Sequence, residues 1–79
     1  MRKIKVEWCE NFIKKTFAKL PEFATGIEIG CFLNMAEKSR LWTRGTYGSP
    51  MSQALEKLTT VKAVKGDNGE PIYYTFELK

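Results

Sequence analysis

The sequence predicts an α+β fold in which three amphipathic helices precede a C-terminal β-hairpin. Apolar residues recur at helical spacing in three separate segments, and strict alternation of apolar and polar residues replaces that spacing near the C-terminus. The chain has 79 residues, and a domain of that size buries only about 60 % of the surface that its unfolded chain exposes. We therefore expect a single domain over residues 1–79 with little room for an enclosed active site.

The first helix is predicted between a basic N-terminus and Pro21, which ends it. Its buried stripe has the i, i+3, i+4, i+7 spacing of an amphipathic helix and comprises Val6, Cys9, Ile13, Phe17 and Leu20. Trp8 is expected in the same core. The other face of this helix is basic and carries Lys14, Lys15 and Lys19.

The second helix is predicted to begin near Gly26. Thr25 and Glu28 have the spacing of a capping box, in which a hydroxyl and a carboxylate each satisfy a backbone N–H at a helix start. Gly30 costs about 1 kcal/mol relative to alanine inside a helix, so we expect another backbone to approach closely there. The apolar stripe of this helix comprises Ile29, Phe32, Leu33 and Ala36.

Ser49 and Pro50 predict the start of the third helix, because serine caps free N–H groups and proline at the first helical position loses no hydrogen bond. Its apolar stripe comprises Met51, Ala54, Leu55 and Leu58. Polar or short residues lie on its other side.

The last segment predicts a β-hairpin. Residues 59–64 (TTVKAV) are rich in β-branched side chains, and the Asn68–Gly69 dipeptide tolerates the positive φ of a tight turn. Pro71 is expected at the edge of the returning strand and not in its interior. The returning strand alternates strictly and presents on one face Ile72, Tyr74, Phe76 and Leu78.

This order of elements resembles that of the winged helix-turn-helix family over the whole chain. Residues 49–58 (SPMSQALEKL) occupy the position of the recognition helix, and residues 61–78 (VKAVKGDNGEPIYYTFEL) occupy that of the wing. Residues 22–25 (EFAT) are a candidate for the small strand that joins the wing in a three-stranded sheet. The connection over residues 37–48 is longer than the turn of a simple helix-turn-helix, which leaves the angle between the second and third helices undefined.

The resemblance implies duplex DNA binding, with the third helix in the major groove. It assigns DNA contact to residues on or next to that helix, which are Ser49, Ser52, Gln53, Lys57 and Thr60. Gln53 is expected to read a base, because its amide can pair bidentately with adenine N6 and N7. Lys57 and the hydroxyls are expected to touch phosphates.

The charge distribution directs a bound duplex toward the N-terminal arm and the loop. The net charge is +4, and residues 49–79 contribute nothing to it, since four lysines are offset by four acidic residues. Asp67 and Glu70 at the wing tip would repel phosphate. The candidate DNA contacts in the loop are Lys38, Arg40, Arg44 and Tyr47.

Two interpretations of this loop remain open. In one, Arg40 and Arg44 bind phosphate and the glycines let a backbone approach. In the other, the glycines only turn the chain and both arginines are solvated. Leu41 and Trp42 are expected to anchor the loop in the core under either interpretation.

Composition argues against an enzyme. The chain lacks histidine, and its carboxylates are scattered without a Gly-rich phosphate loop or paired acids. We expect no cofactor and no metal site, and we expect Cys9 and Cys31 to be buried thiols. No apolar run approaches the length of a membrane span, so we expect a cytoplasmic protein that does not engage a membrane.

The function predicted from the sequence is therefore that of a small transcriptional regulator that binds duplex DNA. A homodimer is expected, because one module contacts too few bases for high specificity. The alternative is a protein–protein interaction module of the same fold, an adaptor or inhibitor that acts on a nucleic-acid-handling complex. Single-stranded nucleic acid is a third option, suggested by the basic and aromatic residues of the loop.

Overall fold

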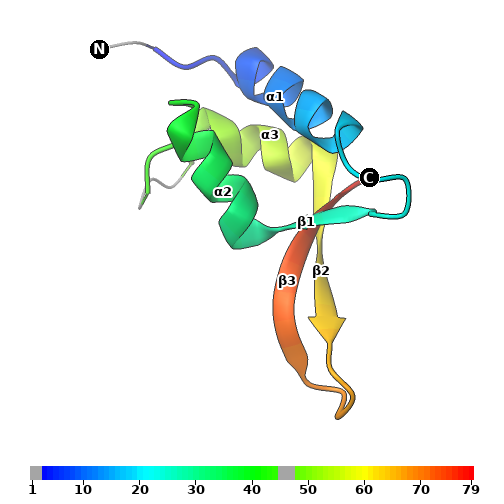
Figure 1. The fold of residues 1–79 in the computed structure, drawn as a ribbon. Coiled ribbons are helices and arrows are strands. Elements are labelled where there is room, and N and C mark those ends of the chain that lie inside the picture. The colour runs from blue at the N-terminus through cyan, green and yellow to red at the C-terminus, as the bar shows by residue number, and fades with distance from the viewer. Residues whose placement is uncertain (1–2, 45–47) are drawn as a thin grey trace.

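The computed structural model describes residues 3–44 and 48–79. Within these residues the chain forms, in order, α1 (Val6–Ala18), β1 (Gly26–Glu28), α2 (Ile29–Lys38), α3 (Pro50–Leu58), β2 (Thr59–Lys65) and β3 (Pro71–Leu78) (Figure 1). The three strands make one antiparallel sheet in the order β1-β3-β2. The predicted α+β class, with three helices before a C-terminal hairpin, is confirmed.

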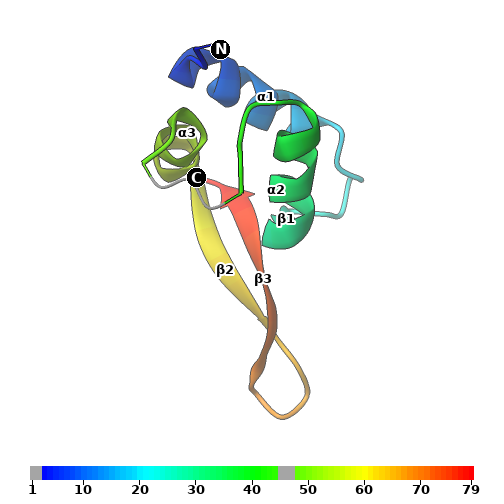
Figure 2. The ribbon, with the colours of Figure 1, turned by 90° about the vertical axis from the view of Figure 1, so that its left-hand side faces the viewer.

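The helices gather at one end of the sheet, and the hairpin of β2 and β3 extends away from them (Figures 1 and 2). α1 packs against α3, while α2 follows directly on β1 and lies beside the sheet. The result is an elongated molecule with extents of 46 × 28 × 21 Å. The helical end and the hairpin tip, which we define as residues 66–70, are therefore far apart.

Phe32 of α2 is at the centre of the core and is fully buried. Its ring meets Phe12 and Phe17 of α1 and Phe76 of β3, at centroid distances of 5.5, 6.4 and 5.6 Å. Aromatic pairs of this kind contribute about 0.5–1.5 kcal/mol beyond the area that they bury. The apolar stripes predicted for the three helices supply most of this core, which comprises Cys9, Ile13, Phe17, Phe32, Ala36, Leu41, Met51, Ala54, Leu55 and Phe76.

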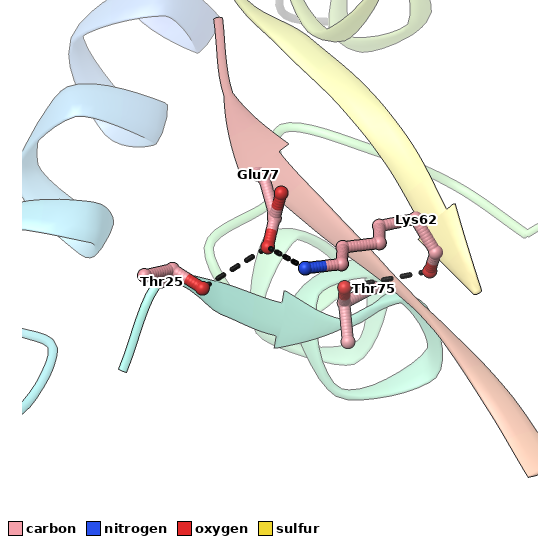
Figure 3. A network of polar contacts seen from close by, with 4 residues as sticks. All are labelled: Thr25, Lys62, Thr75 and Glu77. Carbon is pink, nitrogen blue, oxygen red and sulfur yellow. Dashed lines mark hydrogen bonds and ion pairs between the residues drawn. The ribbon is translucent and has the colours of Figure 1, made fainter. Parts of the chain in front are cut away.

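The predicted capping box is wrong, and α2 begins at Ile29 instead of near Gly26. The Thr25 hydroxyl donates to Glu77 Oε1 of β3 at 3.0 Å (Figure 3). Glu28 is the N-cap of α2, and its carboxylate accepts a hydrogen bond from the Gly30 N–H at 3.3 Å. Residues 26–28 are thus drawn out of the helix by pairing with β3, a partner about fifty residues away in the sequence.

The small strand exists, but it lies at Gly26–Glu28 and not at residues 22–25. A Cβ at Gly26 would lie 2.8 Å from the Phe76 carbonyl oxygen, so glycine permits the close approach of β1 to β3. At Gly30 the nearest atoms to such a Cβ outside the helix backbone would be those of the Glu28 carboxylate and not a neighbouring main chain. The close backbone approach expected at Gly30 therefore occurs at Gly26.

The Glu77 carboxylate of β3 contacts side chains from both neighbouring parts of the sheet. Besides the bond from Thr25, its carboxylate lies 3.7 Å from Lys62 Nζ of β2 (Figure 3). The Thr75 hydroxyl donates to the Lys62 carbonyl at 3.5 Å. This network spans from the residue before β1 across β3 to β2.

The third helix and the hairpin form as predicted. Ser49 is the N-cap of α3, its hydroxyl accepting from the Ser52 N–H at 3.2 Å, and Pro50 is the first helical residue. β2 begins directly after Leu58. Gly69 has a φ of +83° in the turn, and Pro71 is the first residue of β3.

Two predicted core residues are exposed. Trp8 lies one position off the buried stripe of α1, remains 37 % exposed and has the Lys5 ammonium 5.8 Å from its ring. Cys31 lies on the outer side of α2, whereas Cys9 is buried as expected. Helical spacing fixed the stripe but gave no information on how far the core extends around each helix.

Candidate nucleic-acid interface

The candidate residues on α3 differ in how free their polar groups are. Ser49 is buried, and its hydroxyl both caps the helix and lies 3.2 Å from the Ser52 hydroxyl. Ser52 is half-buried, while Gln53 is exposed at the next position of the first turn. Ser49 therefore sets where α3 starts, and Ser52 and Gln53 form the part of this start that solvent reaches.

Gln53 is directed back toward the loop. Its Nε2 donates to the Gly48 carbonyl at 3.3 Å, next to a backbone φ of +66° at Gly48. This bond is exposed, so a ligand can replace it at little net free energy. Thr60, the last candidate along the chain, is exposed on β2 opposite Glu77.

Lys57 faces α1. Its Nζ lies 2.9 Å from Glu10 Oε1, and the Glu10 side chain is only 19 % exposed. The partly buried carboxylate holds the ammonium beside α1, although 69 % of the Lys57 side chain remains exposed to solvent. Glu56, the neighbouring exposed residue of α3, is acidic, so the outward side of this helix has no excess positive charge.

The loop after α2 is anchored in the core, as predicted. Leu41 is buried, its N–H donates to the Ala36 carbonyl at 3.0 Å, and Trp42 packs partly buried against the same core. Arg40 adopts a φ of +61° just before this anchor and is exposed. The structure thus supports an anchored loop that presents a cation to solvent.

The other basic candidates lie on either side of Arg40. Lys38 is exposed at the end of α2, and Arg44 is exposed with its Nε 3.8 Å from Glu37 Oε2. An exposed ion pair of this length contributes about 0–1 kcal/mol to stability, so Arg44 can leave Glu37 and bind a ligand at little cost in free energy. Tyr47 lies outside the described residues.

A basic groove that the sequence did not assign as a site lies between α1 and α2. It has a volume of about 360 Å³ and is lined by Phe12, Lys15, Thr16, Lys19, Met35, Lys38 and Ser39. The sequence indicated this groove only through Lys15 and Lys19, which lie one helical turn apart on the same face of the predicted first helix. Their meeting with Lys38 depends on how the two helices pack.

Neither thiol is activated. Burial raises the pKa of Cys9, whose Sγ lies 4.0 Å from the Leu41 carbonyl. The Cys31 thiol donates to the Glu28 carboxylate at 3.0 Å, and this hydrogen bond together with the nearby negative charge raises the pKa of Cys31. Both thiols are thus held in the protonated, less nucleophilic form.

Residues 3–44 and 48–79 offer neither a cluster of metal-binding side chains nor a helix suited to crossing a membrane. No group of three or more His, Cys, Asp or Glu side chains there is placed to hold a metal ion. In the same ranges, no helix has the length and apolar character needed to traverse a lipid bilayer.

Comparison with known proteins returned no relative of this chain: no family model, no curated protein and no solved structure matches it.

Proposed function

We propose that this chain is a winged helix-turn-helix protein that binds duplex DNA and acts as a transcriptional regulator. The observation that supports this most directly is the arrangement α1-β1-α2-α3-β2-β3 with strand order β1-β3-β2. A third helix followed at once by a two-stranded hairpin is the arrangement that inserts a helix into the major groove and sets a wing beside it.

The rigidity of the link between α3 and the hairpin supports the same proposal. β2 starts at the residue after α3 ends, and the Thr59 hydroxyl donates to the Leu55 carbonyl at 2.6 Å across this junction. Thr59 is buried. Helix and hairpin therefore dock as one preorganised unit, which lowers the entropic cost of binding two neighbouring features of a duplex.

We assign phosphate contact to Lys38, Arg40 and Arg44, which are exposed on the segment that leads from α2 to α3. Guanidinium groups bind phosphate through paired hydrogen bonds. Ser52 and Gln53 are the residues assigned to base edges. In this assignment the acidic hairpin tip lies away from the phosphate backbone of the DNA, because Asp67 and Glu70 would repel the phosphates.

The test is a fluorescence-anisotropy titration with random-sequence duplex at about 50 and 200 mM salt, the range over which phosphate contacts are measurable. Arg40→Ala with Arg44→Ala is expected to weaken binding and to lower the slope of log K against log salt by about 2. The control variant, Lys65→Ala with Lys79→Ala, removes the same charge outside the assigned segment and should keep most of the slope.

Salt-independent binding by the unmodified chain would contradict phosphate contact. An unchanged slope in the arginine variant would remove the loop from the interface.

A protein–protein interaction module, an adaptor or inhibitor, is the second candidate. The outward side of α3 favours it, because Glu56 is exposed there and Lys57 is paired with Glu10. A helix face without net charge suits a protein surface better than a phosphate backbone. No binding to duplex at either salt concentration would favour this second candidate.

A further inference from the structure

The groove between α1 and α2 combines a basic rim with an apolar floor. Lys15 and Lys19 of α1 and Lys38 of α2 supply the rim, and no carboxylate is among the described residues that line it. The floor is formed by Phe12, which is partly buried against the core, and by Met35, which is exposed. A site of this composition fits an acidic segment that also carries an apolar side chain.

The hairpin tip of the same chain has the complementary composition. Asp67 and Glu70 are exposed within it, and Ile72 follows at the start of β3 with 68 % of its surface exposed. Lys65 directly precedes the tip and is exposed as well, so residues 65–72 together carry a net charge of −1, opposite in sign to the rim, and expose one large apolar side chain.

The tip is also ordered by its own hydrogen bonds. The Gly66 N–H donates to the Glu70 carbonyl at 2.9 Å, and the Glu70 N–H donates to Asn68 Oδ1 at 3.1 Å. The Gly69 N–H donates back to the Gly66 carbonyl at 3.0 Å. A preformed tip loses little conformational entropy when it docks.

The groove and the tip cannot meet within one molecule. The groove lies among the helices and the tip at the far end of the hairpin (Figures 1 and 2), in a molecule 46 Å long. A tip can therefore enter this groove only from another molecule, and in an antiparallel pair each copy would supply its tip to the other. Such a pair is closed by a two-fold axis and uses each contact twice.

We propose that two copies of this chain form an antiparallel dimer in which each hairpin tip occupies the partner's groove between α1 and α2. Ile72 packs on Phe12 and Met35, while Asp67 and Glu70 face the three lysines of the rim. No residue of α3 lines the groove, so the dimer leaves the outward side of α3 available. Lys38, which we also assigned to phosphate contact, belongs to this rim, so DNA and the partner's tip would compete for it. The test of the dimer involves no DNA.

The test is sedimentation equilibrium of the full chain from about 1 μM to about 1 mM, the range of weak reversible association. The groove variant is Lys15→Glu with Lys19→Glu, and the tip variant is Asp67→Lys with Glu70→Lys. Each alone is expected to raise the dissociation constant at least about tenfold, because like charges then face each other. A control variant, Lys14→Glu with Lys79→Glu, reverses two lysines outside the groove.

Mixing the groove variant with the tip variant supplies the decisive measurement. In a mixed dimer, both contacts again pair opposite charges, so association should return to within a few-fold of that of the unmodified chain. Circular dichroism checks that each variant is folded, and Ile72→Ser, which changes no charge, provides a second variant that should weaken the dimer.

Two results would overturn the proposal. One is an unmodified chain that stays monomeric up to the highest concentration. The other is a dimer that neither reversal weakens, which would mean that the copies meet through another surface.

Discussion

Lys57 of α3 and Glu10 of α1 form an ion pair with 2.9 Å between Nζ and Oε1, and it links the two helices that pack most closely in this protein. The sequence suggested that Lys57 touches DNA phosphate. In the folded chain its ammonium already has a partly buried partner, so we expect Lys57 to act first as a structural residue.

Lys57→Gln should therefore lower the free energy of unfolding by about 0.5–1 kcal/mol, within the range measured for partly exposed ion pairs. A double-mutant cycle with Glu10→Gln, followed by urea denaturation, isolates the pair energy. Lys65→Gln, an exposed lysine outside this pair, is the control and should change stability by less than about 0.5 kcal/mol. A coupling energy of zero together with a large loss of DNA affinity in Lys57→Gln would contradict the structural role and support a DNA contact by Lys57.

Ser49→Ala should destabilise the protein by about 1 kcal/mol, because the Ser52 N–H loses its acceptor at the start of α3. Ser49→Asp keeps an acceptor and should recover most of this loss. Ser39→Ala is the control, since Ser39 is exposed and ends α2 through its backbone N–H alone. Equal losses in the alanine and aspartate variants would contradict the capping role.

Phe32→Ala should cost about 3–5 kcal/mol, the usual result of removing a buried aromatic ring. Because small domains have only about 5–15 kcal/mol of total stability, we expect this variant to be largely unfolded or close to it. Phe23 is 94 % exposed, and Phe23→Ala should stay within about 0.5 kcal/mol of the parent chain. Thermal denaturation followed by circular dichroism compares the two phenylalanine variants directly.

Cys31 should be alkylated slowly by iodoacetamide at neutral pH although it is exposed, because the Glu28 carboxylate raises its pKa. The ionised carboxylate disfavours the thiolate, so the rate should rise as pH increases toward and through the thiol pKa. Glu28→Gln removes the negative charge and should shift this rate profile to lower pH. Mass spectrometry locates the label, with Cys31→Ser as the control.

The opposite result, an unchanged pH profile in Glu28→Gln, would mean that the carboxylate does not govern the thiol.

Helix prediction succeeded where the decisive interactions are local. Ser49 and Pro50 marked the start of α3 because capping and the fixed φ of proline involve neighbouring residues. The prediction for Thr25 was wrong because the decisive interaction is not local. Its hydroxyl could cap a helix in the predicted capping box, but it donates to Glu77 of β3 instead. No residue within ten positions of Thr25 in the sequence indicates that Glu77 competes for its hydroxyl.

The candidate site shows the same division. Arg40, Arg44 and Lys38 could be selected by charge alone, and they are exposed. The ion pair of Lys57 with Glu10 depends on how α1 packs on α3. Whether Lys38 lines the same groove as Lys15 and Lys19 depends on how α1 and α2 are placed. Spacing along one helix does not give the position of another helix.

The sequence by itself determined the number and order of helices, the apolar stripes that they bury and the hairpin turn at Asn68–Gly69, because periodicity, capping and turn chemistry act over a few residues. Only the tertiary structure decided that residues 26–28 form a strand, that Cys31 and Trp8 are exposed, and that a basic groove opens between α1 and α2. Those outcomes depend on contacts between residues far apart in the chain, where the sheet and the packed helices compete with local preference.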